Sequence, residues 1–357
     1  MKKTAIYAQL QNYVGWDIGG AHLKVARLSP DMEVEAVLQI ACPLWRGIGE
    51  LQRAYQTACK ELSISSSILD PTHIVTMTGE LTDNFNDRKQ GVYEILDTMC
   101  RLLGQPFKVY ASDKGILNHN EVSDIESVAS QNWHATAEWL AASCEEGILV
   151  DMGSTTTDLV PFKHGLIEVQ GYDDATRMRY GELIYTGISR TPVMAISDHF
   201  NIAGVNCPIT TENFATIADV YRILEQLSED DDLYPTCDNA AKTIFASARR
   251  LERMFGLDWA EDLDATRVKA QAIANAQQQK ISLALSALIK RARLSDTTYI
   301  VGAGSGYKIV QCIAERLGLR FMPYHHLLDN LPQHLEDVVC RCASAVSVAS
   351  LARRKHL

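Results

Sequence analysis

Two glycine-rich turns carry the residues with the clearest chemical potential. In the first, an apolar strand ends at Asp17 and continues into Ile18-Gly19-Gly20; in the second, a strand ends at Asp151 and continues into Met152-Gly153-Ser154. An aspartate at a strand end can hold a hard cation such as Mg²⁺, usually through water. The small residues after it let the backbone approach a ligand and present N–H groups to an anion. Each turn therefore predicts a site for a metal-bound phosphate.

The two turns repeat each other along the chain. The segments 14–24 and 148–158 both read as an apolar strand ending in Asp-x-Gly, a turn of small residues and a second strand. The two aspartates are 134 residues apart (151 − 17), a period that is too long for a solenoid and suits a duplicated domain. One isolated Asp-x-Gly is best explained as a tight turn. The matching pair favours two turns that face each other and together enclose one diphosphate or nucleotide.

A third glycine-rich segment contains Gly302, Gly304 and Gly306. It follows an apolar strand and precedes a helix, which would aim N–H groups and a helix N-terminus at a ligand. The segment is weak evidence by itself, because it is not a full dinucleotide fingerprint with a distant acidic partner. We expect it to join the other two turns at one site.

Side chains on the three turns form the candidate site. The catalytic candidates are Asp17, His22, Asp151 and Asp158. Two of these, Asp17 and Asp151, are also the candidate ligands of Mg²⁺. The candidates for contact with phosphate or nucleotide are Gly19, Gly20, Lys24, Gly153, Ser154, Thr155, Thr156, Arg190, Gly302, Gly304 and Gly306. The threonine hydroxyls suit phosphate, although β-branched residues also simply favour a strand.

Several of these side chains have open alternatives. His22 suits a general base because its ordinary pKa lies near neutrality, and a structural or phosphate-facing role is equally compatible. Asp158 suits a base, a metal ligand or a turn cap. For His134, within a predicted helix, a packing role is favoured. Three arginines suit either an anionic substrate or surface ion pairs: Arg177, Arg179 and Arg190.

Alternating strands and helices are expected to position these residues. Hydrophobic periodicity predicts strands at 13–16, 23–28, 33–40, 72–78, 107–111, 148–150 and 298–301. It predicts helices at 50–62, 91–103, 122–144, 211–230, 239–253, 307–317 and 331–354, and one or two helices in 260–293. Gly104 stands where a helix stop is expected. No long Pro/Gly linker separates the halves, which predicts two closely packed domains with the turns between them.

Length and composition limit the function classes. The 357 residues suit two domains. The net charge of −10 argues against nucleic-acid binding, which needs concentrated Lys and Arg. No apolar run approaches the ~18 residues of a membrane span. The nine scattered cysteines, without a Cys-x-x-Cys pair, suit reduced thiols in a cytoplasm. We expect a soluble cytoplasmic protein with small-molecule partners, and a homo-oligomer is compatible with the sequence.

The expected domains follow from the repeat. Residues 1–12 are expected to form a disordered leader, and residues 13–146 form the first domain. Residues 147–357 form the second domain, with a helical insertion at about 211–293.

The three turns resemble the phosphate and nucleotide loops of the actin, sugar kinase and Hsp70 superfamily. Asp17–Lys24 looks like the first phosphate loop, Asp151–Asp158 like the second and Val301–Gly306 like the nucleotide-base loop. The resemblance implies an α/β fold of two RNase H-like domains, with ATP or ADP as a further candidate ligand. Kinases of the superfamily carry a hydroxyl residue after Gly-Gly, where this chain has Ala21. That departure weakens the case for ATP-driven phosphoryl transfer.

More narrowly, the chain is similar to the hydantoinase A/oxoprolinase group, and within it to a family linked to tetrahydromethanopterin-dependent one-carbon transfer. The phrases that carry this resemblance are Gly15–Lys24, Asn132–Ala137, Gly181–Gly187, Arg190–Pro192 and Ala218–Arg222. It implies a transferase of methanofuran synthesis that joins an aminomethylfuran-methyl diphosphate to the phenol of γ-glutamyltyramine and releases diphosphate. Lys24 or Arg190 would meet the phosphates. The alternatives are an ATP-dependent kinase, an oxoprolinase-like hydrolase and a non-catalytic nucleotide-binding regulator.

Overall fold

The computed structural model describes residues 11–64, 71–295 and 298–354. Residues 1–10, most of the predicted disordered leader, lie outside these ranges. Contacts group the chain into two compact units. Among the described residues, unit 1 contains those up to Leu149, Val160–Thr176 and those from Met322 onward, whereas unit 2 contains Val150–Leu159 and those from Arg177 to Phe321. This grouping differs from the predicted boundary between 146 and 147, because two later segments pack with the first unit.

Unit 1 is built on a six-stranded sheet of order β3-β2-β1-β4-β5-β6. Its strands are β1 (Tyr13–Ile18), β2 (His22–Leu28), β3 (Val34–Ala41), β4 (Thr72–Met77), β5 (Lys108–Tyr110) and β6 (Ile116–Asn118). β1 is antiparallel to β2 and parallel to β4, so Asp17 lies opposite Lys24 on one side and Thr76 on the other. All six residues of β1 are buried, as expected for a central strand that is covered on both faces.

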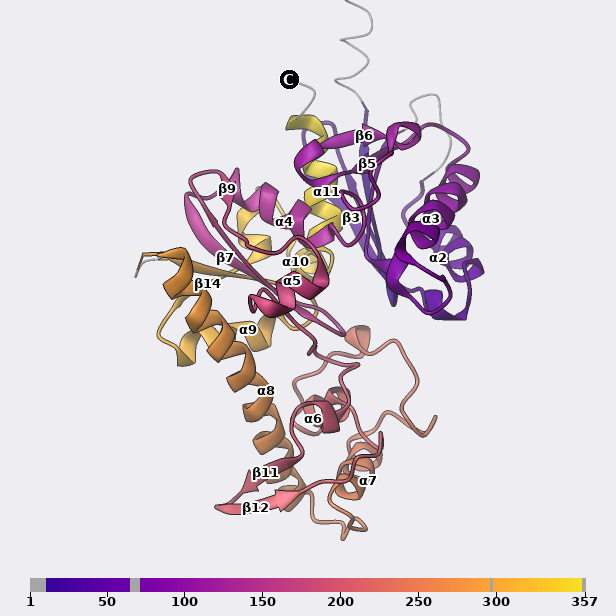
Figure 1. Ribbon diagram of the computed structural model, residues 1–357. Coiled ribbons are helices and arrows are strands. Elements are labelled where there is room, and N and C mark those ends of the chain that lie inside the picture. Colours follow the sequence, from indigo (N-terminus) through magenta and orange to yellow (C-terminus); the bar gives the residue numbers. More distant parts are fainter. Residues whose placement is uncertain (1–10, 65–70, 296–297, 355–357) are drawn as a thin grey trace, which may run out of the picture. The chain divides into compact units, whose positions relative to one another are not determined.

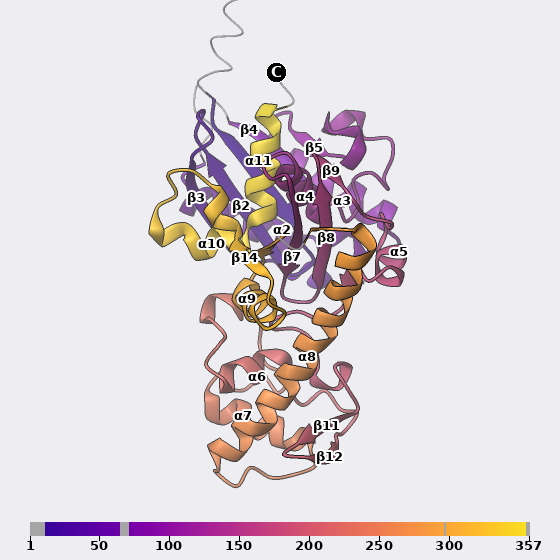
Figure 2. The ribbon, with the colours of Figure 1, turned by 90° about the vertical axis from the view of Figure 1, so that its left-hand side faces the viewer.

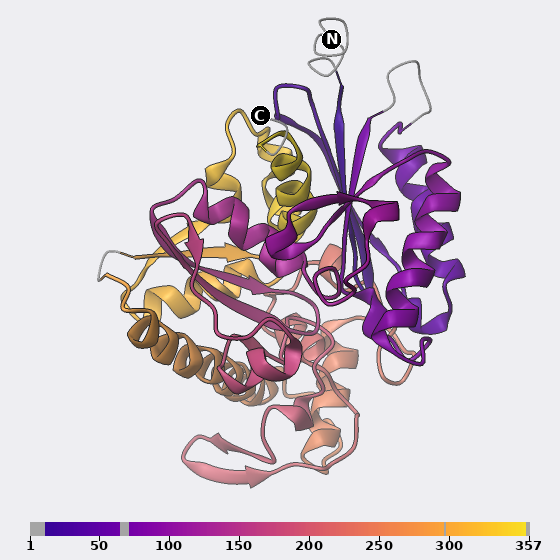
Figure 3. The same cartoon turned by 45° about the horizontal axis from the view of Figure 1, so that its top comes forward.

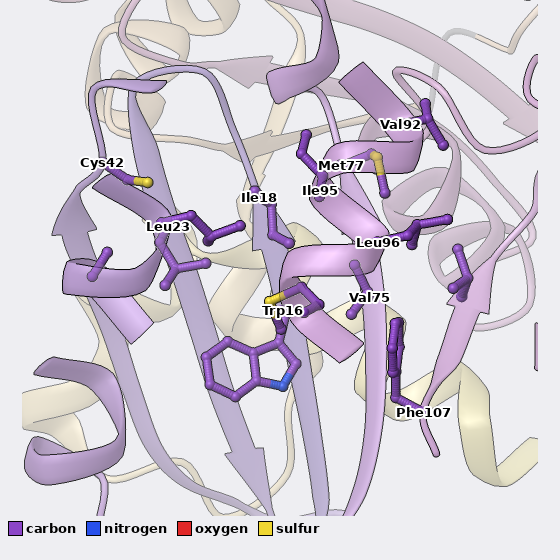
Figure 4. Packing of buried hydrophobic residues seen from close by; sticks show 14 of the residues in the cluster. Trp16, Ile18, Leu23, Cys42, Val75, Met77, Val92, Ile95, Leu96 and Phe107 are labelled. Atoms are coloured by element: carbon purple, nitrogen blue, oxygen red, sulfur yellow. The ribbon is translucent and has the colours of Figure 1, made fainter. Parts of the chain in front are cut away.

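Helices cover both faces of this sheet. Figure 3 shows its strands between α11 (Ala343–Arg354) on one side and α2 (Gly49–Glu61) and α3 (Arg88–Leu103) on the other. The main core lies under α2 and α3, where Trp16 and Val75 of the strands meet Ile95 of α3 (Figure 4). The predicted stop of α3 is confirmed, since Gly104 closes the helix with a φ of 63°.

The opposite face of β1 contacts α11 very closely. A side-chain carbon on Gly15 would lie 2.0 Å from the carbonyl oxygen of Ala345, so only glycine lets the helix lie directly on the strand. The predicted single helix over 331–354 is wrong: the segment forms a short 3₁₀ turn, then α10 (Glu336–Arg341), and then α11 after a break at Cys342. The close contact brings the first turn of α11 to the end of β1.

The second sheet has the order β10-β8-β7-β13-β14, and β9 pairs with β8. Its strands are β7 (Glu146–Met152), β8 (Thr157–Lys163), β9 (Leu166–Ile167), β10 (Leu183–Ile184), β13 (Tyr299–Ala303) and β14 (Arg320–Pro323). The order matches that of the first sheet, with β7, β8, β13 and β14 in the places of β1, β2, β4 and β5. The predicted α/β class is confirmed, and the duplication itself stays a prediction.

Unit 2 carries the predicted helical insertion. Figure 2 shows α6 (Ile217–Ile223) and α7 (Ile244–Met254) beside the long α8 (Leu263–Ala292). The tract 260–293 is a single helix of 30 residues, whereas the helix predicted over 211–230 shrinks to α6. A capping box between Thr216 and Asp219 starts α6 late. The hairpin of β11 (His199–Ile202) and β12 (Val205–Pro208) was not predicted.

The helix predicted over 122–144 is likewise shorter, because α4 covers only Asn132–Ala141. Upstream of it, the side chain of Asp124 accepts the N–H of Glu126, and its carbonyl accepts the hydroxyl of Ser127. Such local bonds from short polar side chains compete with helix formation. Ser130, with a φ of 56°, separates this segment from α4.

Short elements complete the fold (Figure 1). They are α5 (Asp174–Arg179), α9 (Tyr307–Arg316) and the 3₁₀ turns Leu44–Arg46, Gly79–Leu81, Ser112–Lys114, His119–Glu121, Val193–Ala195, Glu229–Asp231, Tyr324–Leu327 and Gln333–Leu335. Over the described ranges, none of the helices has the length and apolar character needed to cross a membrane.

Candidate functional site

The first turn, 17–20, lies at the carboxyl end of β1. The N–H of Gly19 donates to the carbonyl of His22 at 2.9 Å, which folds the chain back into β2. Gly79, just beyond β4, packs against the turn, and a side-chain carbon there would lie 3.1 Å from the carbonyl oxygen of Ile18. Gly19 and Gly20 are partly exposed. The turn thus presents mainly backbone at the end of the strand.

Asp17 is buried at this turn and surrounded by donors. Nδ2 of Asn132 donates to both carboxylate oxygens, at 3.4 and 3.3 Å, and the hydroxyl of Ser344 donates to Oδ2. Nζ of Lys24 lies 3.5 Å from Oδ2. Helix α4, helix α11 and strand β2 therefore meet at one carboxylate. The ion pair holds a cation beside a turn that is suited to an anion.

The second turn, 151–156, repeats the backbone bond of the first. The N–H of Gly153 donates to the carbonyl of Thr156 at 2.9 Å, and both residues stand 134 positions after their counterparts Gly19 and His22. Gly153, Ser154, Thr155 and Thr156 are all partly exposed. The turn thus brings partly exposed backbone and three hydroxyl side chains together, which is a composition suited to an anion.

A neighbouring loop, 186–191, lies directly against the second turn. The N–H of Ile188 donates to the carbonyl of Gly153 at 2.9 Å, and that of Arg190 donates to the carbonyl of Ser154 at 2.8 Å. A side-chain carbon on Gly187 would lie 2.5 Å from the backbone of Thr155. Only glycine permits this approach. We call residues 186–191 the support loop.

The support loop places Arg190 beside the turn. Its Nη1 donates to Oγ1 of Thr155 at 3.4 Å, and its guanidinium lies over the ring of Tyr234, 5.5 Å from the centroid. Burial lowers the pKa of the Arg190 guanidinium from its ordinary value, because the charged form is partly desolvated. A phosphate at the turn would offset that desolvation. The structure thus brings together two of the predicted phosphate contacts, Thr155 and Arg190.

The third segment, 302–306, also converges on Asp151. A side-chain carbon on Gly304, whose φ is 78°, would lie 2.3 Å from Oδ1 of Asp151. The N–H of Gly306 donates to the carbonyl of Met152 at 2.8 Å. Gly302 has a different role, because a side-chain carbon there would meet the ring of Phe321 at 2.5 Å. Gly304 and Gly306 therefore belong to the second turn, and Gly302 serves packing.

His22 and Asp158 occupy positions that favour structural roles. His22 is buried at the start of β2. Oδ1 of Asp158 accepts a hydrogen bond from Nη1 of Arg177 at 2.7 Å, and Arg177 is buried and also donates to the carbonyl of Glu182 at 3.0 Å. Removing either partner of such a pair leaves a buried charge, which is strongly destabilising. Their catalytic roles stay predictions.

Two other predicted side chains lie outside these turns. His134 is buried, with Nδ1 2.6 Å from the hydroxyl of Tyr110 and Nε2 3.6 Å from a carboxylate oxygen of Asp113. This environment agrees with the packing role favoured for His134. Arg179 is exposed at the end of α5.

Any Mg²⁺ ion at these turns would be held by a single carboxylate of the protein at each turn. No group of three or more His, Cys, Asp or Glu side chains is arranged to hold a metal ion in the described part of the chain. Mg²⁺ is usually bound by one or two carboxylates together with water and substrate phosphates. Asp151 supplies one such carboxylate, at the end of β7 and beside the partly exposed residues 153–156 of the second turn. Asp17 fits less well, since Asn132, Ser344 and Lys24 already surround its oxygens.

Sequence reasoning missed several residues that hold the turns in place. Asn132 opens one of the phrases that carry the family resemblance, so a signal existed for it. Ser344 is a hydroxyl residue in an Ala/Val-rich helix, and its burial against β1 could not be read from that pattern. Gln277, which contacts the support loop, lies in a tract of similar glutamines.

Two curated relatives carry the same name, (4-{4-[2-(gamma-L-glutamylamino)ethyl]phenoxymethyl}furan-2-yl)methanamine synthase. The protein of Methanocaldococcus jannaschii is 31% identical over 247 residues, which cover 69% of this chain and 72% of the relative. That of Methanococcus vannielii is 33% identical over 96 residues, which cover 27% of this chain and 43% of the relative.

Among solved structures, the nucleotide-free acetone carboxylase superposes with a TM-score of 0.62 at 9% identity, covering 95% of this chain and 70% of that chain. At this identity the likeness shows the fold alone, and the predicted fold of the actin, sugar kinase and Hsp70 type is confirmed. A family model described as Hydantoinase/oxoprolinase matches residues 72–328. Since that match covers more than half of the sequence, the chain belongs to the hydantoinase/oxoprolinase family.

Proposed function

We propose that this protein is a transferase of methanofuran-type cofactor synthesis. It joins an aminomethylfuran-methyl diphosphate to the phenol of γ-glutamyltyramine and releases diphosphate. The observation that carries the proposal is the 31% identity, over 69% of the chain, to a methanogen synthase. The name of that relative describes a product in which a phenoxymethyl group joins a phenol to a furan. The ether bond is therefore the bond that we propose this enzyme forms.

The chemistry requires help mainly for the leaving group. A bond forms between the phenol oxygen and the furan-methyl carbon, while the bond from that carbon to the diphosphate oxygen breaks. The electron pair leaves with the diphosphate, and the phenol proton passes to a base. The furan ring shares the positive charge on the carbon. The protein must therefore stabilise negative charge on the departing diphosphate.

The second turn is suited to that task. We propose that the backbone of 153–156, with the hydroxyl of Thr155, contacts the diphosphate and that Arg190 pairs with it. Asp151 would hold Mg²⁺, which neutralises diphosphate charge when it is bound. Lys24, placed by Asp17, is the proposed cation of the first turn.

The test is a reconstitution with defined substrates. The purified protein is incubated with the furan-methyl diphosphate, γ-glutamyltyramine and Mg²⁺, without ATP. We expect equal amounts of ether product and diphosphate. Release of phosphate from ATP, with no ether formed from the diphosphate, would contradict the proposal and favour a kinase or hydrolase. Nucleotide binding with no turnover of either kind would favour a regulator.

The state of the cysteines supports a reducing compartment for this chemistry. All nine cysteines are free thiols, and structural disulfides are rare in a cytoplasm. We therefore propose a cytoplasmic enzyme. When cells are lysed in the presence of an alkylating reagent, exposed thiols such as Cys100 and Cys312 should react with it rapidly.

A further inference from the structure

We propose that Gln277, in the middle of α8, is a positioning residue for the second turn: it holds the support loop, and through that loop it places Arg190 for the diphosphate. This inference rests on the proposed function and assigns part of it to the helical insertion. Gln277 is fully buried, so it acts through its neighbours.

The amide of Gln277 makes three short bonds. Its Nε2 donates to Oγ1 of Thr186 at 2.7 Å and to the carbonyl of Gly187 at 2.8 Å. Its Oε1 accepts the hydroxyl of Tyr221, on α6, at 2.7 Å. Both N–H donors of the Gln277 amide and one of its two acceptor lone pairs are thus used, and these bonds connect the insertion to the support loop.

Tyr221 determines which way the amide faces. A phenol hydroxyl that donates to Oε1 turns the NH₂ group toward Thr186 and Gly187. Burial raises the pKa of Tyr221, because the phenolate would be desolvated, so the hydroxyl stays a donor. The pair Tyr221–Gln277 therefore presents two N–H donors to the support loop in a fixed direction.

The support loop transmits this placement to the second turn. Its residues 188 and 190 donate to the carbonyls of Gly153 and Ser154, and Gly187 touches the backbone of Thr155. The hydroxyl of Thr157 donates to the carbonyl of Thr186 at 2.7 Å. Since the loop is bonded on one side to the turn and on the other to Gln277, a shift at Gln277 moves Arg190.

The chain offers a matched control on the same helix. Gln278 is the next residue, is also buried, and donates to the hydroxyl of Tyr221 at 3.4 Å. None of the described hydrogen bonds of Gln278 reaches the support loop. Gln277→Leu and Gln278→Leu therefore each remove a side-chain amide from α8, at neighbouring positions. Only Gln277→Leu removes hydrogen bonds to the support loop.

The experiment compares these variants in two readouts. For Gln277→Leu we expect binding of inorganic diphosphate with Mg²⁺ to weaken about tenfold, and the KM for the furan-methyl diphosphate to rise similarly, because small displacements of positioned groups have effects of this size or larger. The KM for γ-glutamyltyramine should stay within twofold. Gln278→Leu should leave both constants of the diphosphate within twofold of wild type.

A second variant guards against loss of folding. Tyr221→Phe keeps the ring and removes only the donor that orients the amide, so we expect a change in the same direction and about threefold in size. If Gln277→Leu and Tyr221→Phe are folded and bind diphosphate like Gln278→Leu, the inference is wrong. The inference would also be overturned if the KM values for the furan-methyl diphosphate and for γ-glutamyltyramine rose together, and by the same factor in Gln278→Leu as in Gln277→Leu. If wild type neither binds diphosphate nor forms the ether, the proposed function fails first.

Discussion

The two Asp-x-Gly turns share one backbone hydrogen bond and differ in the residues described around them. Both close with a glycine N–H that donates to the carbonyl three residues later, at 2.9 Å. In the first turn the aspartate is buried among Asn132, Ser344 and Lys24. In the second it lies against Gly304, with a support loop and an arginine nearby. Local sequence thus determines the turn, and distant elements determine its chemistry.

The largest expected effects come from the two aspartates. Asp151→Asn removes the proposed Mg²⁺ ligand, and Asp17→Asn removes the charge that holds Lys24. If both turns serve one reaction, each variant should lower kcat by about a thousandfold with an unchanged circular dichroism spectrum. Steady-state assay of ether formation measures this. Near-normal turnover in either variant would remove that turn from the mechanism.

The next prediction concerns the glycine that is specific to the second turn. Gly304→Ala places a carbon 2.3 Å from the position of an Asp151 oxygen, so Asp151 must move. We expect activity to fall about a hundredfold. The control is Gly318→Ala, where φ is also positive, at 69°, and no atom lies within 4 Å of the added carbon. Both variants are strained by about 1–3 kcal/mol, and only the first should lose activity beyond its loss of stability.

A smaller effect is expected from the cations of the two turns. Arg190→Met should weaken binding of inorganic diphosphate by about 2 kcal/mol, the usual size of a hydrogen bond to a charged group. Titration calorimetry in the presence of Mg²⁺ measures it. Arg179→Met changes an exposed arginine of the same unit and should have no effect. Lys24→Met then tests the first turn. If it weakens diphosphate binding as much as Arg190→Met does, both turns contact the diphosphate. If it leaves diphosphate binding unchanged, the diphosphate site is restricted to the second turn.

The smallest effect concerns Glu80, which supports the surroundings of the first turn. Glu80 is buried beside Gly79, and Ser130, two residues before Asn132, donates to its Oε1 at 2.6 Å. Burial raises the pKa of the Glu80 carboxyl above its ordinary value. Its contribution to stability is therefore complete below the unfolded pKa, about 4.3, and is lost as the pH rises through the folded pKa.

Replacement of Glu80 by glutamine tests this reasoning. Relative to Glu80→Gln, the wild-type protein should lose free energy of unfolding as the pH rises above the unfolded pKa of about 4.3, as measured by urea denaturation. Glu80→Ala should be less stable than wild type by about 1–3 kcal/mol at low pH, because the hydroxyl of Ser130 loses its partner, and this difference should shrink as the pH rises. A glutamine variant that becomes less stable than wild type as the pH rises would show that the carboxylate is the favoured form.

The features that could be predicted are those that depend on residues close together in the sequence. The turns at Asp17 and Asp151, the stop at Gly104 and most strands follow from local composition and periodicity. Helix lengths were overestimated where local polar bonds replace the helix, as at Asp124. Contacts between distant segments were not predictable, since nothing in the pattern around Ser344 or Gln277 names Asp17 or Gly187 as its partner. For the same reason Gly302 was assigned to a ligand, although its neighbour is Phe321.

The contact of α11 with Gly15 has a consequence for how the protein is made. During synthesis, β1 leaves the ribosome more than 300 residues before the helix that covers it, at about 5–20 residues per second. For that time one apolar face of the first sheet and the carboxylate of Asp17 lack their final cover. We expect this nascent sheet to be a client of chaperones and to reach its final packing only after α11 emerges. The order of translation thus makes the first turn mature much later than the strand that carries it is made.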